Sequence, residues 1–465
     1  MRTPFPLLWL SLVLASAAMT AQTFPGLTAD NYAGVHGLLL NPASIAGSRT
    51  ASEIHLGSVA ATVNNDYLTF RTKELGAKLD DEFESLVLQR NPGSDRSLNG
   101  AVDVLGPSLL ISFGKHTGVG LLTRARTMYS GRNFSGQLME GIQGNLGDFN
   151  DFSFDQRDHH TTLHAWGEVG LAIATEIVRQ EKHVVKAGAT FKYLQGLGAV
   201  FTYGDALTGA YDANREELDI SGDVTFGRSQ QFYVDDLTFD NRAGGFGLDL
   251  GVIYEWRPTA GKVGEDGQPG YPHRPYRLKV AASLMDLGKI SYDDAYMADY
   301  RVNGTIPLEQ AERGDVEAVL DDNFGGTYRE AMVAIGLPTT LNLLVDYRVT
   351  EKLYVSGLYT SPAGPTERLS TNLTPTVTFA PRLEGRVASL YLPYSMRAGQ
   401  DNTLGLGMRF GFLTVGSGSI VSSFLSDGAQ AADVFVGLKL PFHRKFKKDK
   451  ASKGKGGDAG AVAFR

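Results

Sequence analysis

The stretch LHAWGEVGLAIATEI, residues 163–177, alternates apolar side chains with polar or small ones at every second position. After a polar turn, RQEK at 179–182, the alternation resumes in VKAGATFKY, residues 185–193. A period of two predicts strands with one apolar and one polar face. Both runs exceed the usual strand of about five or six residues, and about ten alternating residues suffice to cross a bilayer as a tilted strand. The stretch therefore predicts a transmembrane hairpin.

The first 21 residues have the features of a secretory signal. Arg2 supplies the positive start, residues 7–15 form a short apolar core, and residues 16–21 are mostly small. We expect cleavage after Ala21, with Ala18 as the alternative. The core is too short to span a membrane, and no later apolar run approaches the ~18 residues that a spanning helix needs. The sequence thus predicts an exported chain whose membrane residence comes from a barrel or a peripheral contact.

Composition narrows the classes of function. The chain has no cysteine, which excludes a lipoprotein anchor, disulfides and cysteine-ligated metal. Its net charge of -7 and pI near 5.8 argue against nucleic-acid binding. The 55 glycines exceed average usage and lie inside the alternating runs, where barrels tolerate them at crowded or bent points. A mean hydropathy of -0.14 agrees with a barrel that has a polar lumen and polar loops.

Further alternating runs follow along the chain, at 53–63, 107–114, 117–128, 244–256, 276–284, 341–348, 353–359, 374–384, 386–396, 403–415, 417–425 and 432–442. Short turns fall near 115, 180, 350, 385 and 416, whereas long connections occupy 64–106, 129–160, 196–243 and 294–337. Outer-membrane barrels alternate short periplasmic turns with longer outer loops. We therefore predict an all-β fold over residues 51–442, an antiparallel transmembrane β-barrel of about 14 strands with long extracellular loops and both termini in the periplasm.

The long connections carry some structure of their own. Apolar residues at helical spacing predict short helices over 75–87 and around 308–320. The 196–243 connection contains its own alternating run, which predicts either a hairpin above the membrane or an extension of the barrel strands beyond it. Residues 443–465 are rich in lysine and predict a disordered basic tail in the periplasm.

The polar faces of the runs carry charges of both signs, which we place in the lumen: Glu168, Lys186, Lys192, Asp249, Lys279, Asp346, Arg348 and Arg409. Rings of a single sign would indicate ion selectivity. Mixed signs instead predict a cross-strand network that braces the interior. Aromatic residues at the ends of the runs predict girdles at the two membrane interfaces: Tyr193, Trp256, Tyr276, Tyr347, Tyr359 and Phe442.

Signatures of catalysis are missing from the sequence. It contains no phosphate-binding loop, dinucleotide fingerprint or hydrolase elbow. Carboxylates and histidines gather between residues 148 and 160, but their spacing fits no calcium loop, and we expect a solvated surface loop there. We expect no enzymatic activity, no cofactor and no metal site.

The motif Asn41-Pro42-Ala43, just before the first predicted strand, resembles the long-chain fatty-acid transporter barrels. That resemblance implies that residues 22–50 fold into the barrel as a plug, whereas the turn chemistry alone fits a periplasmic lead-in. Two further phrases, GLDLG at 247–251 and LPTT at 337–340, resemble an uncharacterised family of Bacteroidota outer-membrane barrels. This second family adds no functional residues.

Two functions follow from these resemblances. The first is a passive outer-membrane transporter or channel for small or hydrophobic molecules. The alternative is a structural or partner-binding barrel of a secretion, gliding or surface-anchoring machinery. The expected partners are outer-membrane lipid and, for the alternative, proteins of such a machinery.

Overall fold

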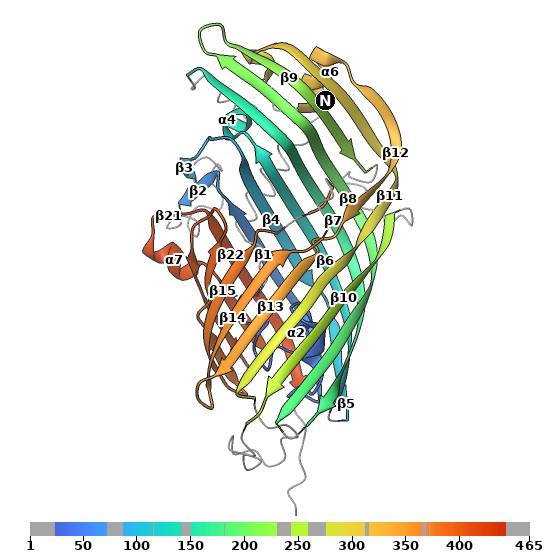
Figure 1. The fold of residues 1–465 in the computed structure, drawn as a ribbon, viewed down its shortest axis with the longest axis vertical. Coiled ribbons are helices and arrows are strands. Elements are labelled where there is room, and N and C mark those ends of the chain that lie inside the picture. Colours follow the sequence, from blue (N-terminus) through green and yellow to red (C-terminus); the bar gives the residue numbers. More distant parts are fainter. Residues whose placement is uncertain are drawn as a thin grey trace, which may run out of the picture.

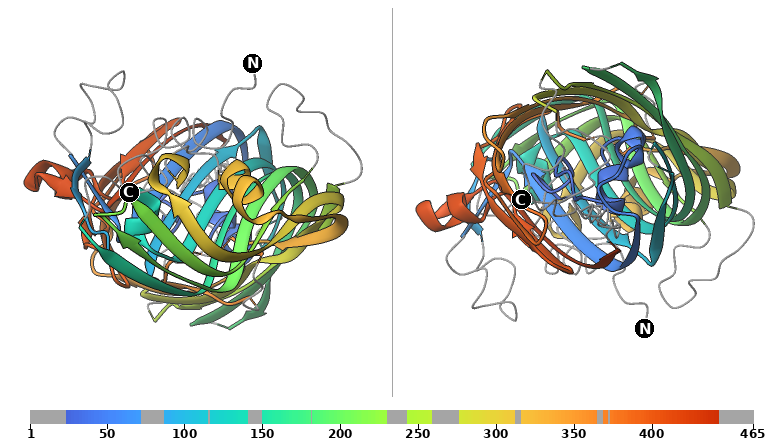
Figure 2. Two further views of the ribbon diagram at one scale, coloured as in Figure 1. Left: turned by 90° about the horizontal axis from the view of Figure 1, so that it is seen from above. Right: turned by 90° about the horizontal axis from the view of Figure 1, so that it is seen from below.

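The computed structural model of the chain describes residues 24–71, 87–114, 116–140, 150–180, 182–229, 243–258, 276–311, 316–364, 369–371 and 373–442. These residues form a closed antiparallel barrel of 14 strands (Figures 1 and 2). The barrel closes where the first strand, β1 (Ser52–Asn65), pairs with the last, β22 (Ala431–Phe442). The predicted signal sequence and basic tail lie outside the described residues. The predicted antiparallel β-barrel of about 14 strands is confirmed.

Several of the wall strands consist of two segments in line. In order around the barrel the strands are β1, β4 (Arg96–Leu105) with β5 (Ser108–Phe113), β6 (Thr117–Phe134), β7 (Phe152–Arg179), β8 (His183–Asp212), β9 (Glu217–Arg228) with β10 (Ala243–Trp256), β11 (Leu278–Pro307), β12 (Thr327–Gly336) with β13 (Thr340–Arg348), β14 (Leu353–Pro362), β15 (Thr376–Glu384), β16 (Ala388–Tyr391) with β17 (Tyr394–Arg397), β18 (Thr403–Leu404) with β19 (Leu406–Phe410), β20 (Leu413–Ser417) and β22.

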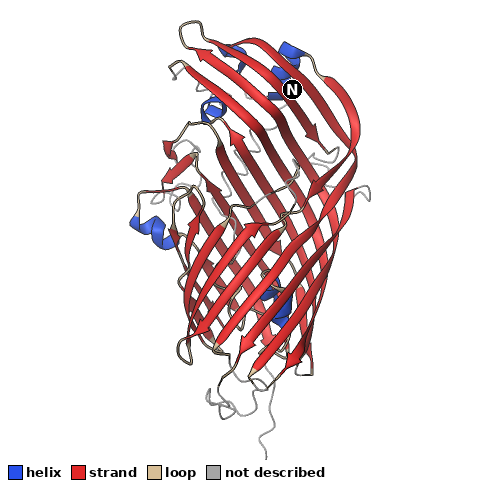
Figure 3. Cartoon of the chain, in the orientation of Figure 1, coloured by secondary structure: helices blue, strands red, loops and turns tan. Residues whose placement is uncertain are grey.

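Helices and a small sheet accompany the barrel (Figure 3). The helices are α2 (Val35–Leu38), η1 (Pro42–Ile45), α4 (Gly136–Glu140), α5 (Leu308–Ala311), α6 (Val316–Phe324) and α7 (Ile420–Leu425). The small sheet consists of β2 (Leu68–Arg71), β3 (Val87–Arg90) and β21 (Gly428–Ala429). The helices near 308–320 are confirmed, whereas residues 75–86 of the other predicted helix lie outside the described ranges. Among the described residues, no helix is long and apolar enough to span a membrane.

The inside–outside assignment of the opening stretch is confirmed. Val169, Leu171 and Ile173 expose about half of their surface on the outside, and Trp166 and Ala172 are fully buried. Exposed apolar side chains likewise face outward from the other strands around the lower barrel. Together these side chains form what we call the belt: Leu121, Val169, Leu171, Ile173, Phe191, Leu250, Val252, Val280, Leu343, Val345, Phe379, Leu406, Met408, Val434, Val436 and Leu438. An apolar outer band around a polar interior is the arrangement that a bilayer requires.

The wall on the side of β7, β8 and β11 rises far beyond the belt. These strands have 28, 30 and 30 residues. Their outer parts continue the sheet: β7 pairs with β8, β8 with β9, β9 with β11 and β11 with β12. We call this raised part of the wall the extension. Much of the predicted loops at 129–160, 196–243 and 294–337 is therefore strand, and the loop prediction is wrong there, including the solvated loop expected before His160. For residues 196–243 the alternative of extended barrel strands is correct over the described part.

Two local predictions are also wrong. Tyr276 does not join an interface girdle, because it precedes β11, where the period-two parity does not yet apply, and its side chain is buried in the lumen. Residues 417–425 do not form a strand. The chain reverses already at Gly411, whose φ of 57° favours glycine, so that β20 ends at Ser417 and α7 follows. The turns predicted near 115, 180, 350 and 385 all occur between adjacent strands.

Candidate functional site: the barrel interior

The inward face of β7 divides the barrel interior into layers. From the outer end inward it presents Phe154, then Trp166, then Glu168, then Ala172. These residues belong in turn to an outer apolar cluster, an inner apolar cluster, an ionic network and a layer that packs on the N-terminal segment, residues 24–50. The inward face of this one strand thus contacts four different layers of the lumen.

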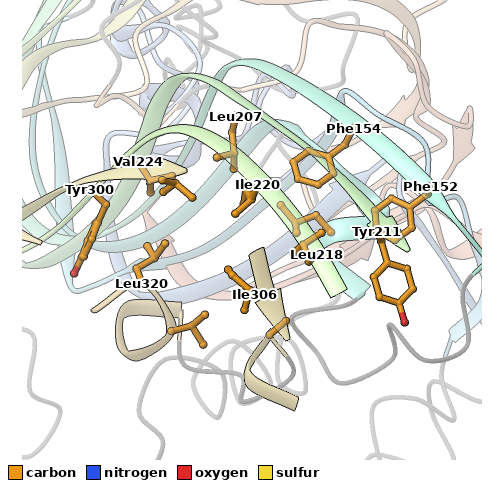
Figure 4. Close-up of a cluster of buried hydrophobic side chains, with 14 of the residues drawn as sticks. Phe152, Phe154, Leu207, Tyr211, Leu218, Ile220, Val224, Tyr300, Ile306 and Leu320 are labelled. Carbon is orange, nitrogen blue, oxygen red and sulfur yellow. The ribbon is translucent and has the colours of Figure 1, made fainter. Parts of the chain in front are cut away.

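The outer apolar cluster lies inside the extension and is covered by short helices (Figure 4). Strands β7, β8, β9 and β11 and the helices α4, α5 and α6 contribute its residues: Leu138, Phe152, Phe154, Leu207, Tyr211, Leu218, Ile220, Val224, Ala298, Tyr300, Val302, Ile306, Ala311, Val319 and Leu320. The Tyr300 hydroxyl donates to Asp321 Oδ1 of α6 over 2.7 Å. This hydrogen bond ties the helix to the wall, so the cluster is closed on its outer side by α6.

The inner apolar cluster fills the next layer and is rich in aromatic and sulfur-containing side chains: Met128, Trp166, Leu194, Ala199, Phe201, Ala243, Ile290, Tyr292, Ala295, Met297, Val333, Ile335 and Leu337. Leu369 and Leu373, from the connection between β14 and β15, pack against it from within the barrel. The Leu369 carbonyl accepts from Gly336 N over 2.9 Å. This outer connection therefore folds inward instead of standing above the rim.

An ionic network crosses the lumen directly below the inner cluster. Lys192 Nζ lies 2.5 Å from Asp286 Oδ1 and 2.8 Å from Asp249 Oδ1. Arg126 Nη1 lies 2.8 Å from Asp286 Oδ2, and its guanidinium stacks 4.9 Å from the centroid of the Trp166 ring. The predicted residue Glu168 joins the network through an ion pair with Arg124. Charges of both signs thus pair between adjacent strands, as Lys192 and Asp249 do, and between strands that are not neighbours, as Arg126 and Asp286 do, which is what a bracing network requires.

Sequence reasoning missed several members of this network. Arg124 contacts Glu168 at 3.2 Å and also pairs with Asp103. Arg124 and Arg126 have the inward parity of their run, so the signal was present in the alternation. Asp286 is different, because strict alternation after inward Met285 would point it at lipid. A bulge at this point, with φ of 56° at Asp286, turns its side chain inward.

A second ionic network joins the wall to the N-terminal segment. Asp346 accepts from Arg382 Nη2 at 2.7 Å, lies 3.4 Å from Lys279 Nζ and also accepts from the Tyr276 hydroxyl. Arg382 continues to Glu384 over 3.1 Å. Glu384 in turn receives the segment: Arg49 Nη1 lies 3.3 Å from it, and Asn31 Nδ2 donates to it over 2.8 Å.

The segment is also fixed to β19 by a buried ion pair and to β22 by hydrogen bonds from a buried lysine. Arg409 Nε lies 3.0 Å from Asp30 Oδ2, and the Tyr391 hydroxyl donates to the same carboxylate. Burial alone would raise the pKa of Asp30, but Arg409 and Tyr391 hold the pKa well below its usual range, so the carboxylate stays charged. Lys439 Nζ donates to the Ala33 carbonyl over 2.8 Å and pairs with Glu53 at 3.0 Å.

The motif Asn41-Pro42-Ala43 lies against the inner face of β8, β10 and β11. Asn41 Nδ2 donates to the Ala282 carbonyl over 2.9 Å, and Asn41 Oδ1 accepts from Ala43 N over 2.9 Å. The wall carries glycines here: a Cβ on Gly251 would lie 2.1 Å from Asn41 Oδ1, and one on Gly188 2.6 Å from Ala43 N. The motif approaches the wall this closely only because these two positions lack side chains.

The predicted lumen charges divide among these groups. Glu168, Lys192 and Asp249 lie in the first network, Lys279 and Asp346 in the second, and Arg409 on Asp30. Lys186 pairs separately with Glu255, at 2.6 Å. Arg348 lies half-buried at the inner end of β13, outside both networks. Within the described ranges, no three His, Asp or Glu side chains are grouped as metal ligands would be.

A closed antiparallel barrel with an apolar belt and an ion-paired interior is of the outer-membrane type. The chain belongs to a family of unknown function, DUF5723, whose model matches residues 42–418. This match confirms the resemblance to an uncharacterised barrel family.

Solved structures to which the chain is similar include a deletion mutant of the TodX monoaromatic hydrocarbon channel, with a TM-score of 0.42 and 11% identity over 92% of this chain and 97% of that one. A Pseudomonas aeruginosa FadL homologue has a TM-score of 0.41 and 10% identity over 92% of this chain and 100% of that one. The Pseudomonas putida toluene transporter TodX has a TM-score of 0.42 and 10% identity over 89% and 95%. No curated protein matches the sequence.

Proposed function

We propose that this protein is a passive, non-enzymatic outer-membrane transporter for small hydrophobic molecules. One observation carries the proposal: the outer half of the barrel interior is lined by two successive apolar clusters. An aqueous pore needs a polar lining, because a hydrated solute that enters an apolar passage loses its hydrogen bonds to water. An apolar solute gains from the same passage. The lining therefore favours apolar cargo, which enters from the outer end.

The described structure corresponds in this proposal to a closed state. Below the apolar clusters, cargo would meet the first ionic network and then the N-terminal segment, whose polar groups are paired with the wall. We infer that the segment acts as a plug and that passage requires its rearrangement. Lipid of the outer membrane is the partner that the belt requires.

The cargo preference can be tested in outer-membrane vesicles with a hydrophobic dye that fluoresces only in lipid. Vesicles that contain the protein are expected to take up this dye faster than empty vesicles, without faster entry of a polar sugar. Leu207→Glu, which places a charge in the outer cluster, should abolish the gain, and Ser153→Glu on the polar exterior of β7 should not. Equal acceleration for dye and sugar would contradict an apolar pathway.

The plug can be tested by displacing Asn41 from the wall. In Gly251→Val the new side chain collides with Asn41, so we expect raised conductance in planar bilayers. Gly167→Val is the matched control, because a Cβ there meets no atom within 4 Å. Deletion of residues 24–46 should raise conductance further. Unchanged conductance in both folded variants would remove the plug from the proposal and leave the apolar lining to be judged by dye uptake.

A further inference from the structure

Helix α7 lies outside the barrel wall. It follows β20 and projects from the wall beside β18 and β22, as Figures 1 and 2 show from the side and along the barrel. None of its residues is buried. Phe424 and Leu425 are 77% and 80% exposed, and Ile420 is 41% exposed. Phe424 and Leu425 are more exposed than every side chain of the belt.

The polarity of α7 is the reverse of that expected for a helix on a soluble surface. Ser422 of the helix and Ser419, which precedes it, are hydrogen-bonded to the barrel: Ser422 Oγ accepts from Leu404 N over 2.6 Å, and Ser419 Oγ accepts from Asp433 N over 3.1 Å. Ser417 Oγ accepts from Ile420 N over 3.0 Å. The hydrogen bonds fix the polar side to the protein and leave the apolar side outward. A surface helix in water has the opposite arrangement.

The helix begins at the height where the belt ends. Ser419 is hydrogen-bonded to Asp433, which is adjacent to Val434, the outermost belt residue of β22. Ser422 is hydrogen-bonded to Leu404, which lies two positions before Leu406, the outermost belt residue of β19. The apolar side of α7 is therefore continuous with the lipid-facing surface of the barrel.

We propose that α7 is a membrane foot whose Phe424 and Leu425 insert into the acyl chains of the leaflet at the outer end of the barrel. Residues 410–426 carry no charge, and the nearest charged residue, Asp427, lies after the end of the helix. A second copy of the chain is the weaker occupant, because a stable protein interface buries about 800 Å² per partner, far more than three side chains offer.

The foot has a mechanical role that the proposed transport does not require. The wall is raised on the side of β7, β8 and β11, whereas α7 projects from the opposite, low side (Figure 1). The extension makes the wall higher on one side of the barrel than on the other. An apolar anchor on the low side resists a tilt of the barrel toward the extension. The foot therefore sets the depth and tilt of the barrel in the membrane.

The test uses the absence of cysteine from the chain, which allows a single nitroxide label at Leu425→Cys. In bilayers we expect collisions of the label with oxygen to exceed those with a water-soluble nickel complex, as for a label at Val436→Cys in the belt. A label at Ser153→Cys, on the polar exterior of the extension, should show the reverse. Phe424→Cys serves as a second position if Leu425→Cys does not fold.

Two outcomes would overturn the foot. A label at 424 or 425 that behaves like the one at 153 would place α7 in water. A label shielded from both reagents would place α7 against protein, such as a second copy. Neither outcome depends on cargo, so failure of the foot and failure of the transport proposal are distinguishable.

Discussion

The inner and outer halves of β7 have the same alternation with opposite polarity. In the inner half, Leu171 faces out and Glu168 faces in, whereas in the outer half, Asp155 faces out and Phe154 faces in. The medium outside decides the difference: lipid surrounds the belt, and water surrounds the extension. The extension is therefore built like a soluble protein around an apolar core, and the membrane part is built around ion pairs. The same strand is thus stabilised by buried ion pairs in its inner half and by apolar packing in its outer half.

The largest effect is expected from breaking the ionic interior of the membrane part. Asp286→Ala leaves Arg126 and Lys192 without their shared carboxylate in a buried site, which should cost about 3–5 kcal/mol. Denaturant unfolding in bilayers measures the free energy of unfolding. Asp155→Ala is the control, since its partner Arg157 is exposed and the pair should contribute below about 1 kcal/mol. Equal losses for the two variants would erase the contrast between the halves.

A cavity in the apolar core of the extension should lower the local stability of the extension. Leu207→Ala removes a buried side chain from the outer cluster and should cost about 2–5 kcal/mol of local stability. Hydrogen exchange should show the loss in β8, β9 and β11 above the belt, with amides between Val169 and Ile173 unchanged. Faster exchange throughout the barrel would mean that the two parts unfold as one unit.

The two exteriors can be compared by placing the same charge on each. Leu171→Arg puts a guanidinium against lipid and should destabilise by about 2–4 kcal/mol at mid-membrane depth. Ser153→Arg, on the same face of the same strand in the extension, should change stability by no more than about 0.5 kcal/mol. Unfolding in lipid vesicles of both variants provides the measurement, and similar costs would refute the placement of the membrane boundary between them.

The smallest effect concerns single hydrogen bonds in the two halves. Thr339 Oγ1 donates to the Asp286 carbonyl over 2.7 Å inside the barrel, and Thr305 Oγ1 donates to Asp219 on the exposed extension. Thr339→Val should cost about 0.5–1.5 kcal/mol. Thr305→Val should cost less, because water can replace the threonine hydroxyl as the hydrogen-bond donor to Asp219. The difference between the two free energies of unfolding should vanish if water reaches Thr339 as well.

The strands of the membrane part and most of their faces can be predicted from the sequence, because the side chains of a strand alternate whatever the strand pairs with. The sequence does not reveal that the alternation reverses polarity in the extension, so it predicts a loop at residues such as Asp155, which lies in β7. It also missed the inward turn of Asp286, since a bulge breaks the parity on which the assignment depends.

The pairing of groups in the lumen depends on closure of the barrel. Asp30 reaches Arg409, and Glu53 reaches Lys439, across separations of more than 350 residues. No spacing in the sequence encodes such pairs, because closure of the barrel between β1 and β22 brings them together. The same holds for α7, whose serines find their partners on β18 and β22 only after the wall has formed. Local periodicity predicts the face of most strand residues, with bulges such as the one at Asp286 as exceptions, and closure of the barrel determines which residues become neighbours.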